Sequence, residues 1–370
     1  MKKTLLALAL VSAGFAAHAQ TVVKIGHAGP LTGPIAHFGK DGEFGARLAL
    51  EDANAKGLTI GGKPVKFELL SEDDQGDPRT ATTAAQRLTD AGVVGVVGHT
   101  TSGASIPASR VYEQAGVPVI TPSSTSPKLT QQNYKVTYRV IANDLQQGEA
   151  MAKYAVEKLQ VKKFAIIDDR TAYGQGLADA FAESVKKQGG EVVGREFTND
   201  KATDFTAILT KIKGRTPDAV FYGGMDAQGA PMLRQMRQLG IASTFLGGDG
   251  TCTGEMLKLA GDAINDKVFC TQAGIPLSMM PGGGEFLSRF KQRFNVDVLL
   301  YAPYAYDAAT ALIEGMKAAD STDPAKYLPA MQKVNFKGVT GNIAFDPKGD
   351  IKEGGVSLYG FANGKWEPLK

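Results

Sequence analysis

Residues 93–127 read VVGVVGHTTSGASIPASRVYEQAGVPVITPSSTSP, and this stretch decides the fold class. Two short runs rich in Val and Ile, 93–97 and 117–120, flank an amphipathic segment at 106–116. Short unbroken apolar runs separated by amphipathic helices are typical of a parallel sheet covered on both faces. Each run leads into a loop crowded with Ser and Thr. Because the carboxyl ends of parallel strands share one edge of the sheet, we expect the two loops to meet there.

The same alternation of strand and helix extends in both directions and starts again near residue 140. Strand-like runs include TVVKIGHAG (21–29) in the first unit and FAIIDD (164–169) and AVFYGG (219–224) in the second. The chain ends in an expected hairpin at 341–369. About 350 residues are too many for one typical hydrophobic core. The sequence therefore predicts an α/β protein of two lobes joined by several chain crossings, with a ligand site between them.

The N-terminus has the pattern of a secretory signal peptide. A basic start is followed by the apolar segment LLALALVSAGFAA and by an A-x-A cleavage site at 17–19. The alternative, a membrane anchor, is disfavoured because the apolar segment is too short to span a bilayer. We expect residues 1–19 to be removed by cleavage after Ala19 and the mature protein to act outside the cytoplasm.

Charge and cysteine content indicate which partners the protein is suited to bind and whether it forms a disulfide. Removing the signal peptide leaves 39 basic and 38 acidic residues, a net charge of +1. This balance gives no electrostatic reason to bind nucleic acid or an anionic membrane. The sequence contains two cysteines, Cys252 and Cys270. In an oxidising compartment we expect them to form a disulfide; the alternative is two buried apolar thiols.

The loops do not support a catalytic or cofactor site. The loop after the first strand misses the spacing of a phosphate-binding P-loop, and no G-x-G-x-x-G opens a helix in the first unit. Ser102 does not lie in G-x-S-x-G, the motif of a nucleophilic serine. His27, His37 and His99 form no close pattern with Cys or acidic residues that predicts a metal site. We therefore expect no catalytic residue, cofactor or metal, and a secreted enzyme is the minor alternative.

The same loops suit the binding of a small zwitterion. Hydroxyls and free N–H groups at a helix start hold a carboxylate, because first-turn N–H groups are unpaired and the helix dipole is positive there. GHTTSGAS (98–105) and TPSSTSP (121–127) provide two such clusters, although helix capping would explain either one alone. Asp249, flanked by glycines at a strand end, is a candidate acceptor for an ammonium group, and a turn Asp is the alternative. Tyr173 offers an aromatic face and a hydroxyl.

Eight segments identify a family when they are taken together. They are GPLTGPIAHFG, EDDQGDP, VVGHTTSGAS, VPVITPSSTSPKLT, DDRTAYGQG, FYGGMDAQG, FLGGDG and GNIAFDPKGD. On these segments the chain resembles the periplasmic leucine/isoleucine/valine-binding proteins, the substrate receptors of ABC importers of branched-chain amino acids. The likeness runs through nearly all of the chain after the signal peptide. Each segment is a weak signal alone, and the set is highly specific.

The resemblance implies a type I periplasmic binding protein, a clamshell of two Rossmann-like parallel-sheet lobes joined by three crossings. The first lobe is expected at about 20–142 and 272–352, and the second at about 143–271 and 353–370. The implied function is binding of an aliphatic, branched-chain L-amino acid by a monomer that delivers it to permease subunits in the inner membrane. Within the same fold, alternative ligands are an aromatic acid, an amide or urea.

The resemblance also implies a ligand site in the cleft, with hydroxyls for the carboxylate, an acid for the ammonium and apolar walls for the side chain. Ser102 and Thr125 are expected to hold the carboxylate, and Asp249 the ammonium. The full set of expected ligand-binding residues is Phe38, Ser102, Ser123, Ser124, Thr125, Tyr173, Met225 and Asp249.

Three features depart from the family's best-known members. Those proteins have Glu in place of Asp249, and they have Tyr in place of both Phe38 and Met225. They also have a first-lobe disulfide at positions that match Gly76 and Thr101. Loss of the Tyr hydroxyls and gain of Met predict a more apolar and more adaptable side-chain pocket.

Overall fold

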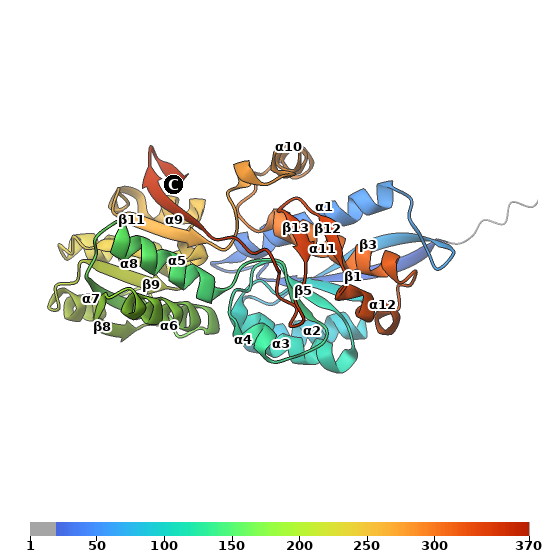
Figure 1. Ribbon diagram of the computed structural model, residues 1–370, viewed down its shortest axis with the longest axis horizontal. Helices are drawn as coiled ribbons and strands as arrows, with labels where there is room; N and C mark the ends of the chain where they lie inside the picture. Colours follow the sequence, from blue (N-terminus) through green and yellow to red (C-terminus); the bar gives the residue numbers. More distant parts are fainter. Residues whose placement is uncertain (1–19, 370) are drawn as a thin grey trace, which may run out of the picture.

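The computed structural model describes residues 20–369 and shows two α/β lobes side by side (Figure 1). The first lobe contains a six-stranded sheet and the second a seven-stranded sheet. Most neighbouring strands in both sheets pair in parallel. The predicted two-lobed α/β fold is therefore confirmed. The expected signal peptide lies outside the described residues.

The first sheet has the strand order β2-β3-β1-β4-β5-β6. Its strands are β1 (Thr21–Gly29), β2 (Thr59–Ile60), β3 (Lys63–Asp73), β4 (Gly95–Gly98), β5 (Val119–Thr121) and β6 (Thr137–Arg139). β2 pairs with β3 in the antiparallel sense, and the other neighbours pair in parallel. The strands β4 and β5 are the two apolar runs that flank the first Ser/Thr loop, and they lie next to each other as the sequence predicts.

Two hydrophobic cores cover the two faces of this sheet. Side chains alternate between them, so Val97 and Ile120 pack with α1 and α11, whereas Val96 and Val119 pack with α2 and α3. The helices of the first lobe are α1 (Ala36–Ala55), α2 (Pro78–Asp90), α3 (Ser102–Ala115), α4 (Lys128–Gln131), η3 (Leu277–Met279), α10 (Gly283–Phe294), α11 (Ala302–Ala318) and α12 (Pro324–Met331).

The second sheet has the strand order β15-β14-β11-β10-β9-β7-β8. Its strands are β7 (Lys163–Asp168), β8 (Glu191–Phe197), β9 (Ala219–Gly223), β10 (Thr244–Gly247), β11 (Val268–Gln272), β14 (Ser357–Ala362) and β15 (Lys365–Pro368). Its helices are α5 (Asp144–Glu157), α6 (Ala172–Lys187), α7 (Thr206–Lys213), α8 (Asp226–Gln238), η1 (Asp249–Thr251), α9 (Gly254–Ala260) and η2 (Gly261–Ala263). One face packs against α5 and α6, and the other against α7, α8 and α9.

The C-terminal segment differs from the single hairpin that the sequence suggests. β13 (Asn342–Ala344) pairs with β12 (Asn335–Lys337) in the first lobe. β14 and β15 form a hairpin that joins the second sheet beside β11. The segment therefore passes from one lobe to the other, because its two halves bury their apolar faces in different cores. The lobe limits expected from the sequence stay a proposal.

Helix α3 starts earlier than the apolar pattern predicts. The amphipathic pattern begins at Ile106, but the helix begins at Ser102. Thr101 is the N-cap, and its hydroxyl accepts a hydrogen bond from the Ala104 N–H at 3.3 Å. The positive end of the helix dipole is therefore brought into the Ser/Thr loop itself.

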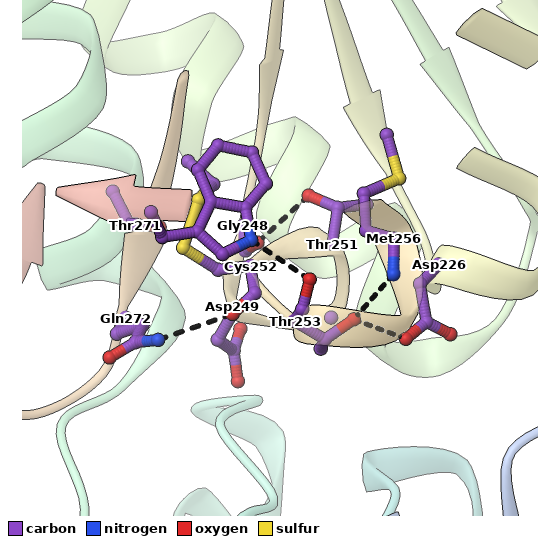
Figure 2. The surroundings of a disulfide bond; sticks show 12 residues. Asp226, Gly248, Asp249, Thr251, Cys252, Thr253, Met256, Thr271 and Gln272 are labelled. Atoms are coloured by element: carbon purple, nitrogen blue, oxygen red, sulfur yellow. Dashed lines mark hydrogen bonds between the residues drawn. A yellow bond between two sulfur atoms is a disulfide. The ribbon is translucent and has the colours of Figure 1, made fainter. Parts of the chain in front are cut away.

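The predicted disulfide between Cys252 and Cys270 is present, with the two Cα atoms 5.4 Å apart (Figure 2). It joins the segment that follows β10 to strand β11. Both cysteines are buried next to Tyr359. Among residues 20–369, no helix has the length and apolar character needed to cross a membrane. The same residues contain no cluster of three or more His, Cys, Asp or Glu that could hold a metal ion.

Replacing both Cys252 and Cys270 with Ser is expected to lower the free energy of unfolding by about 3 kcal/mol, because the disulfide restricts the unfolded chain across a separation of 18 residues. Urea unfolding of the two proteins measures the difference. A reductant should destabilise the wild-type protein to the same extent and leave the double variant unchanged. Equal sensitivity of both proteins to the reductant would contradict this role.

Candidate functional site

A small cavity lies between the two lobes and is lined by residues of both. Tyr173, Met225 and Asp249 line it from the second lobe, and the other lining residues come from the first. The full lining is Phe38, Thr100, Thr101, Ser102, Ser123, Tyr173, Met225, Asp249 and Tyr301. Each lobe thus supplies one wall, and most of the residues expected from the sequence meet here.

The first wall is rich in hydroxyl groups and lies at the start of α3. Thr101 caps this helix, and the Ser102 hydroxyl accepts a hydrogen bond from the Ser126 N–H at 3.1 Å. This bond ties the two Ser/Thr loops together. The Ser123 hydroxyl donates to the Thr100 carbonyl oxygen at 2.8 Å. Hydroxyls and the unpaired N–H groups of a first helical turn are the donors that a small anion requires.

Two of the expected site residues, Ser124 and Thr125, are not among the lining residues. The Ser124 hydroxyl donates to the His99 carbonyl oxygen at 3.1 Å and lies 2.5 Å from the Ser105 hydroxyl oxygen, so it braces the two loops against each other. Thr125 is fully buried, and its carbonyl oxygen accepts a hydrogen bond from the Asp144 N–H at 2.9 Å. Contact of Ser124 and Thr125 with a ligand stays a prediction.

The opposite wall carries a buried carboxylate, Asp249, which is 2% exposed. It accepts hydrogen bonds from the Tyr173 hydroxyl at 2.8 Å, the Gln147 side-chain amide at 2.9 Å and the Tyr301 hydroxyl at 2.6 Å. Burial raises the pKa of Asp249 because water no longer stabilises the charged form, and the three donors oppose that rise. Among the described residues, no Lys, Arg or His forms an ion pair with it. The wall therefore attracts a cationic group.

Two glycines allow Asp249 to occupy this position at the end of β10. A Cβ atom on Gly248 would lie 2.3 Å from Cδ2 of Leu177, and one on Gly247 would lie 2.1 Å from the Thr251 hydroxyl oxygen. Both distances are far below van der Waals contact. A larger residue at either position would displace the turn η1 that begins with Asp249. Close backbone packing thus explains the sequence FLGGDG.

Three residues that orient the acidic wall were not found from the sequence. The Thr271 hydroxyl donates to the Gln147 side-chain oxygen at 2.7 Å, which directs the amide nitrogen toward Asp249. Neither residue gives a sequence signal, because polar residues within a helix or strand are usually on an exposed face. Tyr301 does give a signal of its place in the fold, because it stands immediately before α11 and the Pro in the first turn of that helix marks a helix start.

A second buried acid, Asp144, lies beside Asp249. Its Oδ1 atom is 3.4 Å from the Gln147 amide nitrogen that also donates to Asp249. Burial, and after it the negative charge of Asp249, raises the pKa of Asp144 to about 8. At neutral pH Asp144 is therefore mostly protonated.

Phe38 and Met225 supply the apolar part of the cavity wall. Phe38 is 1% exposed, and its ring centroid lies 5.7 Å from that of Tyr301. Met225 is partly buried and packs against core residues of both lobes. Because a Met side chain has three rotatable bonds, this part of the wall can adjust to ligands of different shape.

A family model described as "Periplasmic binding protein" matches residues 22–362. The chain belongs to this family. Members are extracytoplasmic proteins that bind solutes for ABC transporters and do not transform them. The protein is therefore a solute-binding protein of an ABC transporter, and not an enzyme.

Named relatives narrow the comparison to amino-acid binding. An amino acid binding protein of Pseudomonas aeruginosa is 36% identical over 100% of this chain and 98% of its own length. The leucine-, isoleucine-, valine-, threonine-, and alanine-binding protein of the same organism is 33% identical over 95% of this chain and 93% of its own. A branched-chain amino acid transporter substrate binding protein of Streptococcus pneumoniae, solved in complex with isoleucine, is 30% identical. It has a TM-score of 0.84 and covers 94% of this chain and 98% of that chain.

The two positions that match the family's first-lobe disulfide, Gly76 and Thr101, lie next to each other in this structure. A Cβ atom on Gly76 would lie 3.8 Å from Cγ2 of Thr101, so the two matching positions are side by side. Neither position is a cysteine in this protein. The disulfide between Cys252 and Cys270 lies in the second lobe and joins other segments.

Replacing Asp144 with Asn is expected to change how stability depends on pH. A carboxyl group whose pKa is raised in the folded state stabilises the protein fully below its unfolded pKa of about 4, and this contribution is lost as pH rises through about 8. From pH 5 to pH 8 the unfolding free energy of the wild type should therefore fall, and that of Asp144→Asn should fall by up to about 4 kcal/mol less.

Urea unfolding at several pH values measures this difference. The exposed acid Asp266 provides a control, since Asp266→Asn should leave the wild-type pH profile unchanged. Parallel pH profiles for the wild type and Asp144→Asn would show that Asp144 is not the buried protonated group.

Proposed function

We propose that the protein closes around one aliphatic L-amino acid of the branched-chain class and presents it to the permease subunits of an ABC importer. The observation that carries the proposal is the pairing, across one interlobe cavity, of a hydroxyl-lined helix start with a buried acid. The two ends of a zwitterionic α-amino acid match these two walls. The proposal includes export to the periplasm, cleavage after Ala19 and function as a monomer.

The ligand carboxylate would be held at the start of α3. Ser102 and the backbone of Ser123 line this end of the cavity, and the helix dipole favours negative charge there. Thr125 is the further hydroxyl expected from the family resemblance. All of these donors are neutral, so they bind a carboxylate without the fixed counter-charge that would slow its release to the permease.

The ligand ammonium would be held by Asp249. The acid is buried and has only neutral hydrogen-bond donors around it, so an ammonium group supplies the positive charge that the site itself lacks. The hydroxyl of Tyr173 holds one carboxylate oxygen in place. An aromatic acid or urea has no such cation, and binding it would leave the acid unpaired.

The ligand side chain would lie against Phe38, Met225 and Tyr301, which offer aromatic and thioether surface. Burial of apolar surface at this end provides most of the selectivity for aliphatic side chains. The printed names of the relatives, which include leucine, isoleucine and valine binding, support this class of ligand. Because the two walls belong to different lobes, the contacts are complete only in the closed form, and the ligand shifts the open–closed population.

Calorimetry with leucine, isoleucine, valine, alanine and threonine is the first test, and at least one should bind. Replacing Asp249 with Ala is expected to weaken that binding by about 2–5 kcal/mol, because the ligand ammonium then has no charged partner in a buried site. Asp249→Glu should recover part of the loss, since it keeps the charge. Benzoate, which has no ammonium, serves as a negative control. Unchanged affinity in Asp249→Ala would reject the proposed orientation of the ligand.

Two variants that each remove one hydroxyl distinguish a residue that contacts the ligand from one that supports the loop. Ser102→Ala is expected to weaken ligand binding by about 1–3 kcal/mol, because the ligand carboxylate loses a hydrogen bond from a group that lines the cavity. Ser124→Ala should lower the unfolding temperature and leave the affinity of the folded protein within about twofold of the wild type, since its hydroxyl bonds to other loop atoms. The reverse pattern would assign the carboxylate to Ser124.

A further inference from the structure

A polar contact joins the two lobes at a point outside the ligand cavity. The His37 imidazole Nε2 atom lies 2.9 Å from the Asp226 Oδ2 atom. His37 belongs to α1 of the first lobe, and Asp226 is the first residue of α8 in the second lobe. Neither residue is part of the cavity lining. Because the two helices belong to different lobes, the contact requires that the lobes be together.

Asp226 depends on this contact for a positive partner. Its side chain is fully buried, whereas that of His37 is 24% exposed. The Thr253 hydroxyl donates a hydrogen bond to Asp226 Oδ2 at 2.6 Å. Within residues 20–369, no Lys or Arg forms an ion pair with Asp226. A buried carboxylate is costly without a charged partner, so separation of the lobes would leave Asp226 dependent on water.

The contact is adjacent in sequence to both apolar walls of the cavity. His37 precedes Phe38, and their ring centroids are 4.3 Å apart. Asp226 follows Met225, which packs against both lobes. Movement of either partner therefore moves a residue of the cavity wall.

In the second lobe, one segment, residues 249–253, carries Asp249 of the acidic wall and also contacts Asp226. Figure 2 shows Asp249 and Thr253 in this segment, with the Thr253 hydroxyl bonded to Asp226 of α8. Cys252 lies between Asp249 and Thr253 and is linked to Cys270. The disulfide thus ties the segment that carries Asp249 and Thr253 to strand β11, and Thr253 in turn contacts Asp226.

We propose that His37 and Asp226 form an interlobe lock, which stabilises the closed form and strengthens ligand binding without touching the ligand. A contact made only in the closed form raises the closed fraction, and the apparent affinity for a ligand that binds this form rises with that fraction. Protonation of the imidazole converts the hydrogen bond into an ion pair, so the lock is stronger at lower pH. The expected effect of the lock on ligand affinity rests on the proposed function, whereas its expected effect on the closed fraction of the ligand-free protein does not.

The groups that face the lock from the second lobe are acidic or neutral. Asp226 faces His37 directly, and the Tyr301 hydroxyl of the first lobe lies close enough to Asp226 and Asp249 to be affected by their charge. Burial raises the pKa of Tyr301 well above its usual value, so Tyr301 stays neutral between pH 6 and pH 8.

Other titratable groups near the lock do not compete for Asp226. On α1, Lys40 is exposed, and the Asp41 carboxylate accepts hydrogen bonds from the backbone N–H groups of residues 299–302. Tyr222 in β9 is fully buried, and burial raises its pKa well above the usual range. These groups therefore leave His37 as the basic side chain in contact with Asp226.

The ligand-free closed fraction provides a test that needs no ligand. Spin labels at Arg110→Cys and Glu183→Cys, exposed positions on α3 and α6 of opposite lobes, report the distance between the lobes. Adding His37→Ala should shift the distance distribution toward longer values, and the wild-type distribution should shorten as pH falls from 8 to 6. Identical distributions for both proteins at both pH values would overturn the lock.

Affinity for the amino acid identified above provides the second readout. His37→Ala is expected to bind about 5- to 20-fold more weakly at pH 6, whereas His37→Gln, which still donates a hydrogen bond, should recover part of the affinity. The wild type should bind about 3- to 10-fold more tightly at pH 6 than at pH 8, and His37→Gln should lose this difference. Lys40→Gln, an exposed change on the same helix, is the control and should match the wild type.

The outcomes separate the two proposals. If the wild type binds an amino acid and the His37 variants bind equally well with the same pH profile, the lock is wrong and the proposed function stands. If the wild type binds no amino acid but the lobe distance responds to His37→Ala and to pH, the lock stands and the proposed ligand class is wrong. The unfolding temperature of each variant distinguishes a loss of folding from a loss of closure.

Discussion

The Asp249 carboxylate is buried between two lobes without a basic residue beside it, and the architecture of the cleft follows from this constraint. A buried charge costs several kcal/mol unless hydrogen bonds and an opposite charge compensate it. Tyr173 and Gln147 from the second lobe and Tyr301 from the first supply the hydrogen bonds. None of them supplies a positive charge, so the protein leaves that role to what enters the cleft.

The rest of the second lobe holds this acid in place. Gly248 lets the chain pass close to Leu177, and Gly247 lets it pass close to Thr251. Thr271 fixes the orientation of the Gln147 amide. The neighbouring acid Asp144 carries a proton near neutral pH because burial and Asp249 raise its pKa to about 8. Protonation of Asp144 limits the negative charge of the two carboxyl groups that share the Gln147 amide, which suits a ligand with a single ammonium group.

Because the two walls of the cavity belong to separate lobes, binding of a ligand to both walls depends on how the lobes are placed relative to each other. The first lobe offers a helix dipole and hydroxyls at the start of α3, and the second offers the acid. Tyr301 bridges the walls through its bond to Asp249, and the contact between His37 and Asp226 bridges the lobes beside them. Under the proposed function, the receptor recognises both ends of its ligand at once, and its membrane partner distinguishes the closed form from the open form.

The amino-acid sequence by itself determined the fold class and the positions of the main chemical groups. Apolar runs such as 93–97 and 117–120 could be read as parallel strands because their burial on both faces leaves no polar alternation. Ser102 and Asp249 could be placed because they follow strand ends, where parallel sheets bind ligands. The disulfide was predictable because the sequence contains only two cysteines.

Only the tertiary structure decided which hydroxyls line the cavity and which groups support the acid. Ser123 and Ser124 are adjacent and chemically identical, yet one lines the cavity and the other braces a loop, because backbone direction within a turn is set by packing. Gln147 is distant from Asp249 in sequence and carries no local signal of contact with it, and the helix start beside Tyr301 does not reveal that Tyr301 contacts Asp249. Such pairings arise from the docking of two lobes, and short-range sequence patterns do not contain that information.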